Sequence, residues 1–127
     1  MGNVIKNFRE LSVYRLAFSV TMEIFNLTKK FPKEEKYSLT DQIRRSSRSV
    51  CTNLAEGWYK RRYPAAFICK LTDSISEAAE TQTWLEFSLD CKYIDRITFD
   101  QLSEKYAHII AQLLTMERKS QSFCPNS

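Results

Sequence analysis

Glycine and proline are scarce in this chain, with 2 and 3 copies among 127 residues. A β-sandwich needs many tight turns, and such turns are rich in both residues. The valine, isoleucine and aromatic residues also recur every three to four positions instead of alternating. The sequence therefore predicts an all-α protein, and its length fits a single domain with a core of its own.

Residues suited to metal or covalent chemistry are also few. The chain has one histidine, His108, and its four cysteines form no Cys-x-x-Cys pair. A structural zinc site needs about four such ligands, and di-metal helix bundles use Glu-x-x-His motifs that do not occur here. The serines have no histidine nearby in the sequence, and Cys51 has the spacing of a small core residue. We therefore predict no metal, no cofactor and no enzymatic activity.

Long apolar runs are absent as well. No segment approaches the roughly 20 apolar residues of a membrane span, and the N-terminal residues lack the apolar stretch of a signal peptide. We expect a cytoplasmic protein with reduced thiols and no membrane partner. The net charge of +4 and the pI near 8.9 permit a polyanionic partner without requiring one.

Four stretches carry apolar residues at helical spacing, and we expect helices at about residues 13–31, 38–57, 64–92 and 98–118. Pro32 ends the first, Ser38 with Asp41 resembles an N-terminal cap for the second, and Pro64 suits the first turn of the third. Thr98 with Gln101 forms a capping box for the fourth. The apolar seam expected for the third helix consists of Ile68, Leu71, Ile75, Ala78, Gln82, Leu85 and Leu89.

Short connections between helices favour antiparallel neighbours. The simplest architecture is an up-down-up-down antiparallel four-helix bundle over residues 1–119. Residues 120–127 are polar, and we expect them to form a disordered tail.

The second helix carries three kinds of surface. An apolar or small stripe is formed by Leu39, Ile43, Ser46, Val50, Leu54 and Gly57. Arg44, Arg45 and Arg48 cluster on another side. Between the two lies a polar flank of Gln42, Ser49, Asn53 and Glu56. Because this flank adjoins the core, we expect Asn53 and Glu56 to be buried, Asn53 bonded to a neighbouring helix and Glu56 to a basic or backbone donor.

The basic residues have two interpretations each. Guanidinium groups of Arg44, Arg45 and Arg48 can bind phosphates, or they can be solvated or lie at a subunit interface. Lys60, Arg61 and Arg62 stand between Tyr59 and Tyr63, a pattern suited to single-stranded nucleic acid because bases stack on aromatic rings. The structural alternative is that both tyrosines pack on the end of the bundle.

The third helix carries an unusual outward face. Opposite its predicted seam lie Asp73, Glu77 and Glu80, followed by Trp84, Phe87 and Cys91. A monomeric bundle is not expected to leave two large aromatic side chains facing away from its core. We therefore predict an oligomer interface that includes Trp84, Phe87, Glu77 and Glu80, with the acidic turns complementing arginines of a neighbouring second helix.

Taken in order, several motifs resemble one bacterial protein family. They are Phe31-Pro32, the run from Gln42 to Gly57 with Asn53-Leu54-Ala55-Glu56-Gly57 at its end, and then Leu71, Ser74, Glu77, Glu80-Thr81, Leu85 and Tyr93-Ile94. The set is similar to the family of 23S rRNA intervening-sequence proteins, over about residues 8–114. That resemblance implies small cytosolic homopentamers of antiparallel four-helix bundles with no enzymatic activity. It also implies a distant similarity to the accessory protein of diversity-generating retroelements, a basic pentamer that works with nucleic acid and a reverse transcriptase.

The chain departs from the family pattern after Gly57. Residues 58–64 replace a smaller and more polar connector, and Asp73 stands where glycine is common. A ligand shared at this connector therefore does not follow from the resemblance.

The function that we predict is a non-enzymatic homo-oligomer, pentameric if the resemblance holds, that binds RNA or DNA through a basic rim. We define the basic rim as Lys60, Arg61 and Arg62 with Arg45, to which Arg44 and Arg48 are further candidates. The alternative is an assembly module that binds only protein, either itself or another partner, and has no nucleic-acid role.

Overall fold

The computed structural model describes residues 4–125 and consists of helices and their connections. Four long helices carry the fold: α1 (Ser12–Thr28), α2 (Leu39–Trp58), α3 (Pro64–Asp90) and α4 (Arg96–Arg118). The chain also forms three short helices: the 3-10 helices η1 (Phe8–Glu10), before α1, and η2 (Lys33–Glu35), between α1 and α2, and the C-terminal α5 (Ser120–Phe123). None of residues 4–125 lies in a strand, so the predicted all-α fold class is confirmed.

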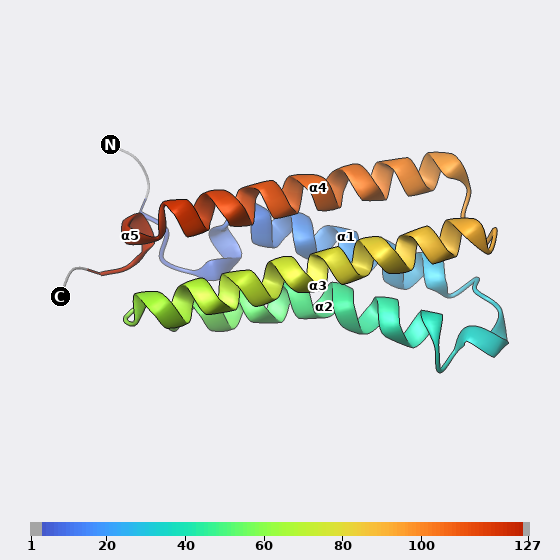
Figure 1. The fold of residues 1–127 in the computed structure, drawn as a ribbon, viewed down its shortest axis with the longest axis horizontal. Coiled ribbons are helices and arrows are strands. Elements are labelled where there is room, and N and C mark those ends of the chain that lie inside the picture. The colour runs from blue at the N-terminus through green and yellow to red at the C-terminus, as the bar shows by residue number, and fades with distance from the viewer. Residues whose placement is uncertain (1–3, 126–127) are drawn as a thin grey trace.

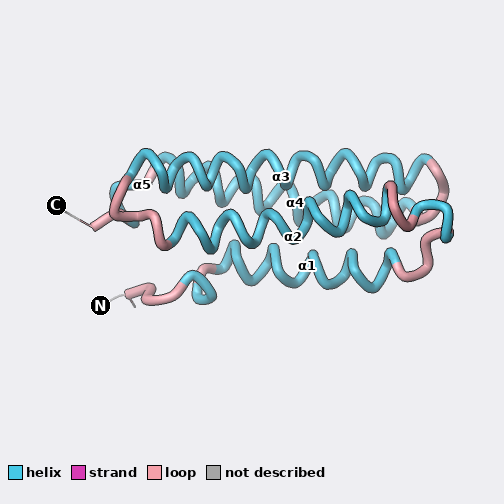
Figure 2. The backbone as a smooth tube through the Cα atoms, turned by 90° about the horizontal axis from the view of Figure 1, so that it is seen from below, coloured by secondary structure: helices cyan, strands magenta, loops and turns pink. Residues whose placement is uncertain are grey.

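The four long helices run side by side, and each is antiparallel to the next (Figures 1 and 2). Consecutive helices pack together and α1 also packs on α4, whereas the backbones of the diagonal pairs α1–α3 and α2–α4 do not approach each other closely. This closed order is the predicted up-down-up-down bundle. Both described chain ends and the α2–α3 connector lie at one end of the bundle, while the α1–α2 and α3–α4 connections lie at the other (Figure 1).

The core contains the stripe predicted on α2, because all six of its residues are buried. On α3 the buried set differs from the predicted seam and consists of Phe67, Leu71, Ser74, Ala78, Thr81, Leu85 and Ser88. The predicted seam members Ile68, Ile75, Gln82 and Leu89 are only half-buried. Apolar periodicity misplaces the seam because serine and threonine occupy the side of α3 nearest α2.

These hydroxyl groups are paired across the helices. Ser74 Oγ donates a 2.7 Å hydrogen bond to the carbonyl oxygen of Val50, and the hydroxyls of Thr81 and Ser46 are 2.8 Å apart. At Gly57 a Cβ atom would lie 3.0 Å from Cβ of Lys70, closer than most such atoms approach. Small side chains thus allow α2 and α3 to pack closely along their whole length.

The start of α2 is capped by a residue outside the helix. Ser38 makes no side-chain cap, although its position had suggested one. Instead the Glu35 carboxylate accepts hydrogen bonds from Ser38 Oγ at 2.6 Å and from the Leu39 amide at 3.3 Å. Its other oxygen accepts a hydrogen bond from the Tyr93 hydroxyl at 2.8 Å. Glu35 thereby links the α1–α2 connection to the α3–α4 connection. These bonds lower the pKa of Glu35, chiefly through Ser38, and the bond to Glu35 raises the pKa of Tyr93 to about 12.

Other helix ends differ from prediction by a few residues. The helix α1 ends at Thr28, before Phe31, and α3 ends at Asp90. The capping box predicted at Thr98 is wrong: α4 begins at Arg96, because the Asp95 side chain accepts from the Thr98 amide at 2.8 Å.

The predicted tail begins with structure. Residues 120–123 form α5, Ser120 is buried, and the Phe123 ring lies 6.2 Å from that of Phe67. Residues 126 and 127 of the predicted tail lie outside the described part of the chain.

Gly57→Leu should destabilise the bundle, because the larger side chain has to push α3 away at Lys70. Overpacking of this kind typically costs about 1 to 3 kcal/mol. Thr52→Leu, on the exposed side of the same helix, is the matched control and should leave the free energy of unfolding nearly unchanged. Urea denaturation followed by circular dichroism measures both, and equal midpoints would contradict close packing at Gly57.

Glu35→Gln should weaken the fold at neutral pH and lose its effect in acid. Because the folded-state pKa of Glu35 is lowered, its ionised form stabilises the protein above the ordinary glutamate pKa of 4.5, and this contribution disappears as the pH falls through the lowered pKa. The stability difference between parent and variant should therefore be greatest near neutrality and vanish at strongly acidic pH. Denaturation at a series of pH values tests this, and a difference independent of pH would contradict it.

Candidate functional site

The end of the bundle that holds both described chain ends (Figure 1) carries an excess of positive charge. Three segments meet there: residues 4–15, 56–64 and 116–125. They carry eight basic residues against three glutamates. We call these basic residues the basic end: Lys6, Arg9, Arg15, Lys60, Arg61, Arg62, Arg118 and Lys119. All but Arg61 are exposed.

The three glutamates at this end each have a partner. Glu10 accepts from the backbone amide of Lys6 at 3.2 Å, and Glu56 pairs with Lys70 at 2.7 Å. Glu117 accepts from the hydroxyl of Thr72 at 2.6 Å. Only Glu56 is paired with a cation, but lysine and arginine outnumber glutamate eight to three in these segments, so the charge presented to a ligand at this end is positive.

The connector between α2 and α3 presents two of its three predicted basic residues. Lys60 and Arg62 are exposed, and the Arg62 guanidinium lies 6.0 Å from the centre of the Tyr63 ring. Tyr59 and Tyr63 are 74% and 63% exposed, so most of each ring is open to stacking, and Tyr59 also makes an edge contact with the Phe8 ring at 6.1 Å.

Arg61 has a structural role in this connector. Its Nε donates to the carbonyl oxygen of Trp58 at 2.7 Å, and its Nη1 donates to that of Phe123 at 3.2 Å. Its guanidinium lies 3.5 Å from the centre of the Trp58 ring. Partial burial lowers the pKa of Arg61, but arginine remains charged at neutral pH. Arg61 therefore fastens α5 to the end of α2, with much of its donor capacity already used.

The structure does not bring the arginines of α2 to the connector. Arg44 donates to Thr28 Oγ1 at 2.8 Å and stacks over Phe25 at 4.7 Å, so it ties α2 to α1. Arg48 is exposed beside the same ring, at 5.8 Å. Arg45 is exposed, with only a 4.0 Å contact to Asp41. At the rise of an α-helix, Arg45 lies about 20 Å from the end of α2, well away from Lys60.

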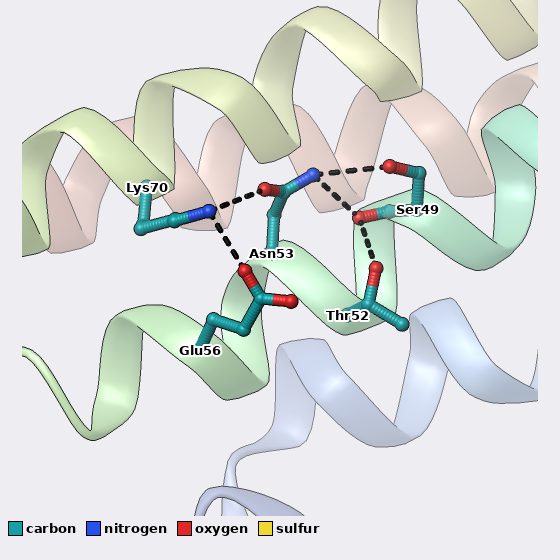
Figure 3. Close-up of polar contacts among 5 residues, drawn as sticks. All are labelled: Ser49, Thr52, Asn53, Glu56 and Lys70. Atoms are coloured by element: carbon teal, nitrogen blue, oxygen red, sulfur yellow. Dashed lines mark hydrogen bonds and ion pairs between the residues drawn. The ribbon is translucent and has the colours of Figure 1, made fainter.

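The polar flank of α2 meets a lysine of α3 (Figure 3). Lys70 Nζ lies 2.7 Å from Glu56 Oε1 and 3.4 Å from Asn53 Oδ1. Asn53 Nδ2 in turn donates to the carbonyl and hydroxyl oxygens of Ser49, at 2.9 and 3.1 Å. Hydrogen bonding of Asn53 across to another helix, and of Glu56 to a basic donor, is therefore confirmed. The Glu56 bond is also the main cause that raises the pKa of Lys70.

The predicted burial of this flank is wrong for Glu56, whose side chain is 57% exposed, and only partly right for Asn53, which is half-buried. The carboxylate can stay in water because Lys70 reaches out to it. Sequence reasoning missed Lys70, although Glu56 and Lys70 are each seven residues from Tyr63 and so face each other across an antiparallel hairpin. Gln42, the third member of the flank, is half-buried at the other end of α2.

The outward face predicted on α3 exposes one of its two large aromatic side chains and half-buries the other. Trp84 is half-buried, its Nε1 donates to Glu80 at 3.2 Å, and its ring lies 5.9 Å from that of Phe87. Phe87 is 54% exposed. These two rings line a groove with Leu39 and Gln42 of α2. Glu80 is exposed and Glu77 is half-buried on the preceding turns.

A second exposed apolar surface lies on α1. Phe18 and Met22 are 52% and 44% exposed, and Tyr14 and Phe25 flank them half-buried. Sequence reasoning missed this surface, although the spacing of four, four and three residues runs parallel to the core seam of the same helix.

Within residues 4–125, no helix is both long and apolar enough to span a bilayer. No three histidine, cysteine, aspartate or glutamate side chains of that part come together in a way that could hold a metal ion.

Asn53→Ala should destabilise the protein more than Glu56→Gln. Asn53 is half-buried and loses bonds to both helices, at a cost of about 1 kcal/mol, whereas Glu56 is mostly solvated. In a double-mutant cycle, Glu56→Gln and Lys70→Met should couple, and the coupling should shrink with added salt. Additive effects of the two changes would contradict a stabilising pair.

Comparison with known proteins agrees with this fold. Residues 9–115 match the family model described as 23S rRNA-intervening sequence protein. Among solved structures, a protein of unknown function from the S23 ribosomal protein family of Bacteroides thetaiotaomicron is similar, with a TM-score of 0.75 and 28% sequence identity over 84% of this chain and 95% of that one. No curated protein matches the sequence. With its fold and most of its length accounted for by the match, the chain belongs to the family of 23S rRNA-intervening sequence proteins.

Proposed function

We propose that this protein is a non-enzymatic, self-associating helical bundle that binds RNA or DNA through its basic end. The observation that carries the proposal is the grouping of eight lysine and arginine residues from three separate segments at one end of the bundle, against only three glutamates, one of which is paired with Lys70. Phosphate groups attract such a surface whatever the base sequence.

Two exposed tyrosines add a contact that charge alone does not supply. Tyr59 and Tyr63 flank Lys60 and Arg62 on the connector, and their rings are open to solvent. Unpaired bases stack on such rings, which favours single-stranded or looped nucleic acid over a regular duplex.

The absence of catalysis is part of the proposal, and it is supported by how the nucleophilic residues are used. Ser46 and Ser47 are both buried and hydrogen-bonded, Ser46 to Thr81 of α3 and Ser47 to the carbonyl oxygen of Arg44 within α2. Burial also raises the pKa of the Cys51 thiol, which keeps it protonated and weakly nucleophilic at neutral pH.

A protein-binding module without a nucleic-acid role is the second candidate. The exposed apolar surfaces on α1 and α3 favour it, because isolated soluble proteins seldom expose large apolar patches. Self-association is compatible with both candidate functions. The family resemblance suggests a pentamer, in which five basic ends would act together through avidity.

Changing Lys60 and Arg62 together to serine should weaken binding to a single-stranded RNA or DNA oligonucleotide and flatten its salt dependence. Each lost phosphate contact on a single strand should reduce the slope of log affinity against log salt by about 0.7. Fluorescence anisotropy across a salt series measures both quantities. Arg61 is left intact, since its loss would also release α5.

The matched control is Lys29→Ser with Lys30→Ser, which removes the same charge from exposed residues at the opposite end of the bundle. This pair should leave affinity and slope close to those of the parent. If both double variants behave alike, or if the parent does not bind at about 50 mM salt, the protein-binding candidate becomes the better account.

A further inference from the structure

The residues that precede α1 lie against the connector between α2 and α3. The Phe8 ring of η1 is buried and makes edge contacts with Tyr14 of α1 at 5.0 Å and with Tyr59 of the connector at 6.1 Å. The η1 turn also packs on both α1 and α2. Phe8 therefore holds the N-terminal segment beside the exposed ring of Tyr59, although the two residues are far apart in sequence.

This packing brings two exposed arginines to the same edge of the bundle end. The Arg9 guanidinium lies over the Phe8 ring at 4.4 Å, and Arg15 Nε donates to the carbonyl oxygen of Arg9 at 3.1 Å. Arg9 Nη1 donates to Asn7 Oδ1 at 3.2 Å, and the terminal nitrogens of Arg15 make no hydrogen bond within residues 4–125. Each guanidinium therefore keeps donors for a phosphate group.

The charge along this edge is positive. Glu10 is the one carboxylate between residues 4 and 15, and it accepts from the backbone amide of Lys6 at 3.2 Å. On the connector side, Lys60 and Arg62 are exposed and no acidic residue stands between Gly57 and Pro64.

The exposed rings and cations follow three neighbouring corners of the bundle end. Tyr63 lies at the start of α3, Tyr59 at the end of α2, and Arg15 in the first turn of α1. The fourth corner is the end of α4, which is diagonal to α2. We define the strip as the exposed residues along these three corners: Tyr63, Arg62, Lys60, Tyr59, Arg9 and Arg15.

We propose that the strip is the path of a single strand of nucleic acid across the bundle end, and that the N-terminal segment forms half of this path. The rings of Tyr59 and Tyr63 stack on bases, and the cations between and beyond them bind phosphates. Alternation of rings and cations is the arrangement by which proteins hold single strands without sequence preference. This inference rests on the proposed function and specifies which part of the basic end performs it.

The length of the strip determines the substrate class. Neighbouring helix axes lie about 8 to 10 Å apart, so a path across three helix ends covers roughly 20 Å. At about 3.4 Å per nucleotide of a stacked strand, this length corresponds to about six nucleotides. The bases of a regular duplex are stacked on one another, so their faces are not available to the tyrosines. The strip therefore fits an unpaired end or loop.

Arg9→Ser with Arg15→Ser tests the N-terminal half of the strip. The probe is an oligothymidylate of about 12 nucleotides, which is long enough to cover the strip. Loss of two phosphate contacts should weaken binding and reduce the slope of log affinity against log salt by about 1.4. Fluorescence anisotropy across a salt series measures both quantities.

The matched control is Arg118→Ser with Lys119→Ser. It removes the same charge from exposed residues at the same end of the bundle, but at the fourth corner, outside the strip. Affinity and slope should stay close to those of the parent. The same series on an oligouridylate should show the same losses, because the strip contacts phosphates and base faces that DNA and RNA share. A loss seen with one of the two probes alone assigns the strip to that nucleic acid.

Arg9→Lys with Arg15→Lys separates phosphate binding from a structural role. Lysine keeps the charge but lacks the planar guanidinium that lies over Phe8. The lysine variant should therefore retain most of the slope of the parent, with the same helix content by circular dichroism. A lysine variant as weak as the serine variant would show that the arginines only support the N-terminal segment, and would overturn the proposal.

Two changes at Tyr59 test stacking. Tyr59→Phe keeps the ring and should bind like the parent, whereas Tyr59→Ser should bind the oligothymidylate about tenfold more weakly, a usual loss for one stacked base. A duplex of the same length should be insensitive to Tyr59→Ser. Equal losses on duplex and single strand would contradict stacking on this ring.

Failure of the strip can be told from failure of the proposed function. If the Arg9 and Arg15 change and the Arg118 and Lys119 change weaken binding equally, the basic end acts through its total charge, so the proposed function stands and the strip is wrong. The strip is also wrong if only the Lys60 and Arg62 change has an effect. A parent that binds neither probe at about 50 mM salt overturns the proposed function itself.

Discussion

Close contact between α2 and α3 is the constraint on which the rest of the molecule depends. Gly57, Ser46 and Ser74 are small enough to let the two helices approach, and Gly57 leaves no room for even a methyl group without movement of Lys70. This packing fixes the hairpin from the connector at one end of the bundle to the groove beside Trp84 at the other. Both proposed surfaces on this hairpin therefore depend on the same line of contact.

The side chains that form the contact between α2 and α3 are polar as well as small. Hydroxyl groups of Ser74 and Thr81 bond across to α2, and Thr21 of α1 bonds to the carbonyl oxygen of Ser47 at 3.0 Å. Each such bond contributes only about 1 kcal/mol, but a buried hydroxyl without a partner would cost as much or more. The bonds therefore act mainly to select one register of α2 against its two neighbours, since a slip by one turn would leave several of these groups unpaired.

Much of this architecture could be predicted from the sequence, because apolar seams and short connections determine which helices form and how they pair. The stripe on α2 was correct at all six positions, because the other faces of that helix between Leu39 and Gly57 are mostly polar. On α3 the method failed where Ser74, Thr81 and Ser88 are buried, because periodicity counts apolar side chains and these residues are polar. The cap at Glu35 was missed because its carboxylate acts from outside the helix that it caps, and the cap at Asp95 was missed because the Thr98–Gln101 pattern pointed to a later start of α4.

The candidate sites were harder to predict. Spacing placed Lys60, Arg61 and Arg62 on an exposed connector. It could not show that the Arg61 guanidinium donates hydrogen bonds to the carbonyl oxygens of Trp58 and Phe123. Nor could it show that the N-terminal segment with Lys6 and Arg9 and the C-terminal end of α4 with Arg118 lie at the same end of the bundle. Contacts of this kind depend on where the chain ends lie in the folded bundle.

The position of the chain ends has a consequence for protein architecture. Both described ends emerge at the basic end, beside the α2–α3 connector (Figure 1). A domain joined to either end of this chain would be held next to the connector, whichever side it was attached to. The two connections at the opposite end, residues 29–38 and 91–95, are the places where an added segment would stay farthest from it. The fold thus directs any covalently linked neighbour toward one and the same surface.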